Sequence, residues 1–181
     1  LDVLAATLAV GGASVVAVQL ANQETGVLQP VAEAYRLAHV HGALLHCDAV
    51  QAAGKIAVDF NDLDVDYLTL SAHKLGGPQG VGALVVRDGL EIKPLLTGGG
   101  QERGFRSGTL PAPLIVGLGE ACRIARAEMA EDDARIGTLR DTLLELGKTH
   151  TVLVVTHGGV LDIAHRLAAG KPLETPRDFT I

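Results

Sequence analysis

The residues best suited to chemistry lie in one short segment, where Ser71, His73 and Lys74 precede a turn rich in glycine and proline. Lys74 stands between the extended run 67–71 and that turn, a position in which an amine can be partly desolvated. Desolvation favours the neutral amine, the form that condenses with an aldehyde. Ser71 and His73 are two residues apart, so in an extended segment both point the same way and can bind one anion. The alternative is a solvated lysine at an exposed strand end.

A second chemical group consists of Asp48 and Gln51. Asp48 ends the apolar run 43–47, and α/β sheets place their ligand-binding groups where strands end. A carboxylate there, with Gln51 one turn further on, can hold a protonated ring nitrogen, the contact that makes pyridoxal phosphate an electron sink. Asp48 serves equally well as the cap of a helix that begins at Ala49. The local sequence leaves both roles open.

Two further stretches contain possible ligands. One is a set of residue types that bind metals: His39, His41, His46, Cys47 and Asp48. We do not expect this set to hold a metal, because it spans a predicted helix, turn and strand, and side chains one or two residues apart on a helix diverge. The other is the glycine-rich segment 98–109, in which Arg106, Ser107 and Thr109 offer anion donors and the glycines allow close backbone approach. A surface loop without function fits that segment equally well.

The elements that must position these residues alternate between strand and helix. This alternation, with glycine-rich turns, predicts an α/β fold with a mostly parallel sheet covered by helices on both faces. The pattern predicts helices over 2–9 and 30–40, strands over 14–20, 43–47, 65–70 and 82–86, and a long helix after Pro113.

The long helix carries an apolar residue at every third or fourth position, and Gly147 and Lys148 suit its end. Cys122 belongs to this stripe, so core packing is its expected role. The stripe consists of Leu114, Leu118, Ala121, Cys122, Ala125, Met129, Ile136, Leu139, Leu143 and Leu146.

Length and composition narrow the functional classes. A chain of 181 residues predicts one domain or slightly more, and a net charge of −6 without a basic stripe argues against nucleic-acid binding. Two cysteines make no disulfide framework, which favours a cytoplasmic setting. The nearly uncharged start lacks a positive leading region and is interrupted by Gly11 and Gly12, so we expect neither a signal peptide nor a membrane span. The first residue is Leu1, consistent with a start inside a longer protein.

Four motifs in order and spacing resemble the cysteine desulfurases of class V of the pyridoxal-phosphate aminotransferase family, over residues 1–147. They are Asn22-Gln23-Glu24-Thr25-Gly26-Val27 with Gln29-Pro30, His46-Cys47-Asp48 with Gln51 and Gly54-Lys55, Ser71-Ala72-His73-Lys74 with Gly77-Pro78 and Gly80, and the loop from Gln101-Glu102-Arg103-Gly104 to Arg106-Ser107-Gly108-Thr109. The resemblance implies that residues 1–148 form a partial large domain of a fold-type I pyridoxal-phosphate-dependent transferase.

The same resemblance implies a role for each site residue toward the cofactor's ring. Lys74 would bond covalently to the cofactor, Asp48 would pair with the pyridinium nitrogen, and Gln51 would bond the ring hydroxyl. Gln23 stands where the family has a second asparagine, and the amide contact is carried over to this longer side chain.

The phosphate contacts implied by the family join two subunits. Ser71 and His73 would hold the phosphate, and Thr109 would reach the phosphate of the neighbouring subunit's cofactor. The resemblance therefore implies a homodimer with shared active sites.

The implied reaction converts L-cysteine to L-alanine and passes the sulfur to an acceptor cysteine, with Lys74 moving protons and His73 assisting. Cys47 on a strand and Cys122 on a buried stripe do not suit the acceptor role, so a sulfur acceptor outside this chain is expected. The family's N-terminal phosphate loop and stacking histidine, and its substrate arginine, are also outside this chain, which predicts little activity for the isolated chain. The alternatives are another class V lyase or aminotransferase acting on a different amino acid, and an inactive α/β fragment.

Residues 149–181 form a separate predicted segment. Over 151–181 a strand, a His-Gly-Gly loop with His157 and a helix resemble the C-terminal piece of the histidine phosphatase (phosphoglycerate mutase-like) superfamily. The nucleophilic Arg-His-Gly motif of that superfamily does not occur in this chain, so His157 is either a packed loop histidine or a relic anion site. We expect a fusion of a desulfurase fragment to this tail near 147–150; an aberrant junction is the alternative.

Overall fold

A computed structural model describes residues 1–151 and divides them into two compact units. The first unit contains Leu1–Leu20 and Gln29–Met129, and the second contains Ala21–Leu28 and the described residues from Ala130 onward. The strand, His157 loop and helix predicted over 151–181 lie outside the described residues, except for Thr151. No helix within 1–151 is long and apolar enough to cross a membrane.

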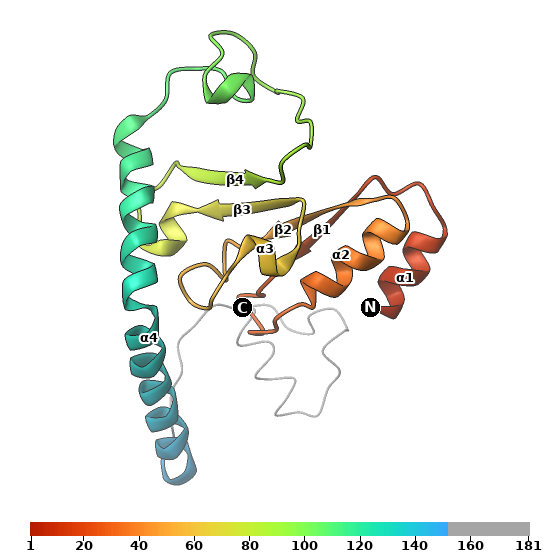
Figure 1. Cartoon of the computed structure of the whole chain (residues 1–181). Helices are drawn as coiled ribbons and strands as arrows, with labels where there is room; N and C mark the ends of the chain where they lie inside the picture. The colour runs from red at the N-terminus through yellow and green to blue at the C-terminus, as the bar shows by residue number, and fades with distance from the viewer. Residues whose placement is uncertain (152–181) are drawn as a thin grey trace. The chain divides into compact units, whose positions relative to one another are not determined.

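A four-stranded sheet forms the centre of the first unit (Figure 1). Its strands are β1 (Val15–Gln19), β2 (Leu44–Asp48), β3 (Tyr67–Ser71) and β4 (Gly82–Val86), and they lie side by side in that order. The first three strands are parallel and β4 is antiparallel to β3. The prediction of a mostly parallel sheet is confirmed, and each predicted strand is present with its bounds displaced by at most two residues.

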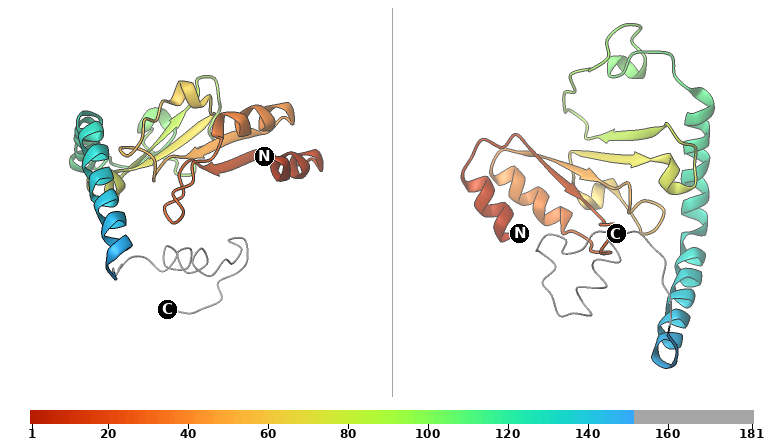
Figure 2. Two further views of the ribbon diagram at one scale, coloured as in Figure 1. Left: turned by 90° about the horizontal axis from the view of Figure 1, so that it is seen from below. Right: turned by 180° about the vertical axis from the view of Figure 1, so that it is seen from behind.

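The α-helices are α1 (Asp2–Ala9), α2 (Val31–Val40), α3 (Phe60–Leu63) and α4 (Ala112–Thr149) (Figure 2). Three of them were predicted, α1 with both bounds correct. The short helix α3 was not predicted, although Asp59 gives it a capping residue: its Oδ1 accepts from the backbone N–H groups of Asn61 and Asp62 at 2.8 and 3.3 Å.

The core of the first unit lies on one face of the sheet. Leu45, Cys47 and Leu68 are buried on that face, where α2 packs its apolar side against β1 and β2. Side chains alternate along a strand, so the intervening residues face the other way. On that second face Val15 is 54% exposed and Leu84 is 50% exposed. Among the described residues the expected helical cover is therefore found on one face, and the open face is the one that carries His46, Asp48 and Ser71.

A buried acid closes the amino-terminal edge of β3. Asp66 is 1% exposed, and its Oδ2 accepts from the backbone N–H of Leu45 and pairs with His39 Nε2, both at 2.7 Å. Arg87, after β4, donates to the carbonyl oxygen of Val65 and contacts Asp66 Oδ1 at 3.6 Å. Buried carboxylates persist when they are satisfied in this way. This network lies at the opposite ends of β2 and β3 from the chemically suited residues.

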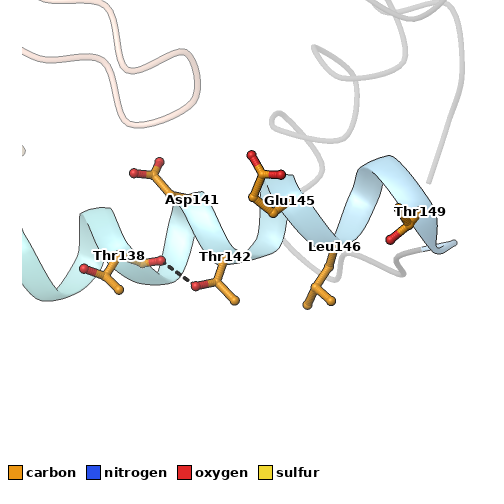
Figure 3. Close-up of a pocket in the computed structure, with 6 residues that line it drawn as sticks. All are labelled: Thr138, Asp141, Thr142, Glu145, Leu146 and Thr149. Carbon is orange, nitrogen blue, oxygen red and sulfur yellow. Dashed lines mark hydrogen bonds between the residues drawn. The ribbon is translucent and has the colours of Figure 1, made fainter.

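The long helix differs from its predicted packing beyond Met129. Ala121 is buried, but four residues predicted to continue the apolar stripe are exposed, so that part of the prediction is wrong: Ile136, Leu139, Leu143 and Leu146. The hollow in Figure 3 lies on this part of α4, and all six of its lining residues belong to this single helix. Within residues 1–151 this hollow is therefore the surface of a single helix.

Candidate active site

Lys74 lies on a short, tightly bonded turn at the carboxyl end of β3. The turn is the 3₁₀ helix η1 (Ala72–Leu75), which ends at Gly76 with a left-handed φ of 76°. The buried Ala72 fixes its start, because its N–H donates to the carbonyl oxygen of Val81 at 3.1 Å and its own carbonyl oxygen accepts from Gly77 at 2.9 Å. Lys74 itself is exposed, so the described residues do not provide the predicted desolvation.

The amino-terminal half of α4 supports this turn through close contacts at two glycines. A Cβ on Gly77 would lie 3.0 Å from the Ala121 Cβ, and a Cβ on Gly117 would lie 2.8 Å from Cγ of Pro78. Only glycine lets the helix approach the turn so closely. The contact therefore holds the segment after Lys74 against a rigid element.

The predicted anion-binding pair is brought together by the structure. The Ser71 Oγ and the His73 Nδ1 are 2.8 Å apart and hydrogen-bonded. Ser71 ends β3 and His73 belongs to η1, so the pair bridges the strand and the turn. A hydroxyl and an imidazole joined in this way form one polar group beside Lys74.

Asp48 occupies the neighbouring strand end. It pairs in register with Thr69 of β3, and the backbone N–H of Ala49 donates to the Thr69 carbonyl oxygen at 3.2 Å. Since paired residues of adjacent strands face the same side, Asp48, Thr69 and Ser71 share the open face. The sheet thus brings the predicted ring partner and the predicted phosphate partner to the same edge.

The capping alternative for Asp48 is correct in part. Its Oδ1 accepts from the backbone N–H of Val50 at 3.0 Å, but the residues that follow form consecutive turns and not a helix. The prediction of a helix beginning at Ala49 is therefore wrong. One carboxylate oxygen is used in the turn, and the carboxylate stays at the edge of the sheet.

Gln51 lies in these turns and is held by a residue that the sequence argument did not single out as a site residue. The Lys55 Nζ donates to the backbone oxygen of Gln51 at 3.1 Å and to its Oε1 at 3.3 Å. A Cβ on Gly54 would lie 2.6 Å from Cδ2 of Leu75, so the Gln51 turn packs directly on η1. The appearance of Gly54-Lys55 within the second motif was the available signal for this contact.

Gln23 lies in the second unit and is exposed. Its segment folds into a turn because the Oδ1 of Asn22 accepts from the backbone N–H groups of Glu24 and Thr25, both at 2.9 Å. The segment closes with a bridge between Ala21 and Leu28. The contact of Gln23 with a cofactor stays a prediction.

The loop that carries Thr109 is bonded within itself. It contains the 3₁₀ helix η2 (Glu102–Gly104) and lies beyond β4 (Figure 1). Ser107 is buried and its Oγ accepts from the Gly100 N–H at 3.3 Å, a contact within the loop. Its role as an anion donor stays a prediction. Thr109 is exposed. Its role toward a partner's cofactor stays a prediction.

The histidines and cysteines near Asp48 are used separately. His39 pairs with Asp66 and His46 Nε2 lies 3.1 Å from Thr69 Oγ1; within 1–151 no three His, Cys, Asp or Glu side chains are grouped for a metal. Burial and, to a smaller extent, the negative charge of Asp48 together raise the pKa of Cys47 to about 11. A neutral, buried thiol is a poor nucleophile. This agrees with the expectation that Cys47 does not accept sulfur.

The family model for class V aminotransferases matches residues 2–157. Cysteine desulfurase IscS of Ehrlichia chaffeensis is 44% identical over 164 residues, which cover 89% of this chain and 39% of that protein. The probable mitochondrial cysteine desulfurase of Dictyostelium discoideum is 50% identical over 134 residues, covering 73% of this chain and 30% of that protein. The chain therefore spans well under half the length of these relatives.

Solved structures agree with the sequence matches. A NifS-like protein from Rickettsia africae superimposes with a TM-score of 0.77 and 34% identity, over 82% of this chain and 42% of that chain. A second NifS-like protein gives a TM-score of 0.74 and 41% identity, over 80% of this chain and 40% of that chain.

These likenesses confirm the predicted fold, part of the large domain of a pyridoxal-phosphate-dependent transferase, and members of this family use pyridoxal phosphate. With its strand ends, its lysine turn and most of its length matched, the chain belongs to the class V aminotransferase family.

Proposed function

We propose that the chain is part of a pyridoxal-phosphate-dependent cysteine desulfurase, which releases L-alanine from L-cysteine and passes the sulfur to an acceptor cysteine. The observation that carries this proposal is that Asp48, the Ser71–His73 pair and the turn of Gln51 lie at one edge of the sheet. Asp48 and the Ser71–His73 pair end adjacent strands on the same face, and the Gln51 turn packs on η1, which carries Lys74. The names of the relatives supply the substrate class.

The residues present fit the chemistry of the cofactor. The carboxylate of Asp48 suits a protonated ring nitrogen, the amide of Gln51 suits the ring hydroxyl, and the Ser71–His73 pair suits the phosphate. The bound cofactor would act as an electron sink for the substrate's bonds. Each of these contacts uses a side chain that the fold has already placed on the open face or on the turns beside it.

The chain's own chemical work falls mainly to Lys74. Its exposed amine can bond to the cofactor's aldehyde and, once released, can take and return a proton at the substrate carbon. The turn of η1, fixed by Ala72 and packed on α4 through Gly77, keeps that amine in place. His73, which precedes Lys74 on the same turn and is bonded to Ser71, is the residue proposed to assist the proton transfer.

The central experiment tests covalent cofactor binding at Lys74. Titration of the chain with pyridoxal phosphate should produce an absorption band at a longer wavelength than the absorption of the protein alone. Borohydride reduction should then leave the mass of the cofactor on the peptide that contains Lys74. Lys74→Ala should abolish both signals, while Lys93→Ala, at another exposed lysine, should keep them. A labelled peptide without Lys74 would refute the assignment.

Substrate choice is tested next, because another class V lyase or aminotransferase would use the same cofactor site. Release of alanine from L-cysteine, and not of a product from other amino acids, supports the desulfurase. Activity on a different amino acid alone supports the second class. Failure of the chain to bind the cofactor supports an inactive α/β fragment.

The cellular partners are part of the proposal. We propose a homodimer in which Thr109 of one subunit reaches the other subunit's cofactor, an acceptor protein that takes the sulfur, and a cytoplasmic location. The exposure of Thr109 supports its role toward a neighbouring subunit. The burial of Cys47 supports an acceptor cysteine on another protein. The bacterial IscS, 44% identical, supports the location, although the mitochondrial relative is 50% identical over a shorter stretch.

We also propose that residues 149–181 are a histidine phosphatase-like segment fused to the desulfurase part near 147–150. Its likeness to a histidine phosphatase fragment rests on the sequence pattern of 151–181 alone, a predicted strand, the His-Gly-Gly loop with His157 and a predicted helix. The class V family match continues to residue 157, beyond the predicted junction near 147–150, and α4 runs without a break to Thr149, within that range. Intact-mass analysis of the protein from its native source tests the junction, because a full-length desulfurase there would remove the fusion.

A further inference from the structure

Lys55 contacts one of the residues assigned to the cofactor site. Its ammonium group donates to the backbone oxygen and to the Oε1 of Gln51, at 3.1 and 3.3 Å. An ammonium group contains only donors, so the amide atom that faces it must be the oxygen. The NH₂ group of Gln51 is thereby left on the side away from Lys55. The contact therefore favours one orientation of the amide over its flipped form.

A glycine contact brings Lys55 near Lys74 as well. Gly54 has a φ of +75°, and a Cβ there would lie 2.6 Å from the Leu75 side chain. Lys55 follows Gly54 and Lys74 precedes Leu75, so this contact brings the two lysines into one neighbourhood. Lys55 is exposed, yet its pKa is lowered, first by the loss of part of the water around its ammonium group and then by the positive charge of Lys74. The two amines therefore sense each other without any ligand.

We propose that Lys55 is a positioning residue of the cofactor site: it turns the Gln51 amide so that its NH₂ group donates to the ring hydroxyl oxygen, and it places a second cation beside Lys74. This inference rests on the proposed function, since it names how Gln51 would meet the cofactor. A donor fixed before binding costs no rotation when the ligand arrives, which strengthens binding. Lys55 touches Gln51 and acts through it.

The first test measures the dissociation constant of pyridoxal phosphate and the position of its absorption band in variants of the chain. Lys55→Met should weaken binding by about three- to tenfold, the range expected for one hydrogen bond, and should shift the band. Lys55→Arg retains a donor and a charge and should restore both. Lys93→Met is the matched control at an exposed lysine elsewhere. Equal affinity and equal spectra in Lys55→Met and Lys93→Met would overturn the proposal.

A double variant separates positioning from a general effect on the fold. In a chain that carries Gln51→Leu, Lys55→Met should weaken binding no further, because the residue through which it acts is gone. Additive losses in the double variant would show that Lys55 acts by another route and would overturn the positioning role. Circular dichroism of each variant checks that the fold is intact.

The second test needs no cofactor, so it can fail independently of the proposed function. Carbon-13 labelling of the lysine ε positions allows the pKa of Lys55 to be followed by NMR in the ligand-free chain. Lys74→Ala should raise the pKa of Lys55, because the neighbouring positive charge is removed. An unchanged Lys55 titration would overturn the neighbourhood of the two amines. Absence of cofactor binding by the wild-type chain would instead overturn the proposed function.

Discussion

Asp48 shows how one carboxylate can serve the fold and the site together. Its Oδ1 accepts from the Val50 N–H and starts the turns that contain Gln51, while its position at the end of β2 brings it to the edge shared with Ser71. The capping role and the ligand role do not compete, because a carboxylate has two oxygens and about four acceptor sites. The two roles can be separated by substitution.

Asp48→Asn should leave stability within about 0.5 kcal/mol of wild type, because the amide oxygen can still accept from Val50. Asp48→Ala should lose about 1 kcal/mol, the usual contribution of one hydrogen bond. Both should weaken binding of pyridoxal phosphate, since both remove the charge that pairs with a ring nitrogen. Urea unfolding and cofactor titration measure the two effects. Undiminished binding in Asp48→Asn would refute the ligand role.

Cys47 predicts a pH dependence of stability. Burial raises its pKa to about 11 from an ordinary value of 9.0, so the folded chain holds the thiol proton more tightly than the unfolded chain does. Its contribution to stability is therefore complete below pH 9 and is lost as the pH rises toward 11, by on the order of 2 to 3 kcal/mol. The free energy of unfolding, measured with denaturant across this pH range, should fall less steeply with pH in Cys47→Ala than in wild type.

A labelling experiment provides the control for this prediction. At pH 8 a thiol reagent should modify the partly buried Cys122 of the folded chain well before Cys47. If Cys47 reacted as fast as Cys122, or if wild type and Cys47→Ala lost stability in parallel above pH 9, the burial argument would be wrong.

At the scale of the elements, the lysine turn depends on a helix that lies far along the chain. The first turns of α4 approach η1 at Gly77 and Gly117, where a Cβ would meet Ala121 or Pro78. The α4 helix was predicted from its apolar spacing, yet that spacing did not show which residues contact the turn. Close approach at glycine depends on the path of both backbones, so it is visible only in the folded chain.

Two glycines of α4 offer a matched pair of substitutions. Gly117→Ala should destabilise the chain by about 1 to 3 kcal/mol, because its Cβ would meet the Pro78 ring at 2.8 Å. Gly119→Ala, with nothing within 4 Å of the new Cβ, should stabilise it by up to about 1 kcal/mol through helix propensity. Thermal unfolding measures both. Equal effects of the two changes would contradict the packing of the helix on the turn.

At the scale of the whole molecule, shared active sites can be tested by mixing inactive chains. If Thr109 serves the neighbouring subunit's site, Lys74→Ala and Thr109→Ala chains should complement each other after mixing. Random pairing in a two-fold dimer then restores about a quarter of the wild-type sites, because half of the dimers are mixed and each has one intact site. Covalent cofactor incorporation after borohydride reduction measures the recovery.

Each variant refolded alone is the control for this mixing experiment. No recovery on mixing, together with sedimentation of the wild-type chain as a dimer, would place Thr109 in the site of its own chain. Sedimentation of the wild-type chain as a monomer would refute the proposed homodimer.

Sequence patterns were sufficient to predict the four strands, three of the four described α-helices and the chemical candidates. Alternating apolar and polar stretches specify where strands and helices form, since burial of one face requires that period, and the motifs around Asp48 and Lys74 identified the family. These features are local: each depends on residue types within a few positions of one another.

Tertiary structure alone decided which of these residues meet. The register of β2 with β3 brought Asp48 and Ser71 to one face, and the close approach of Gly54 to Leu75 brought the turn that contains Gln51 against the turn that carries Lys74. The same packing left Lys74 and the later apolar residues of α4 exposed, against expectation. Such outcomes depend on the distances between segments separated in the chain, and no spacing within one segment contains that information.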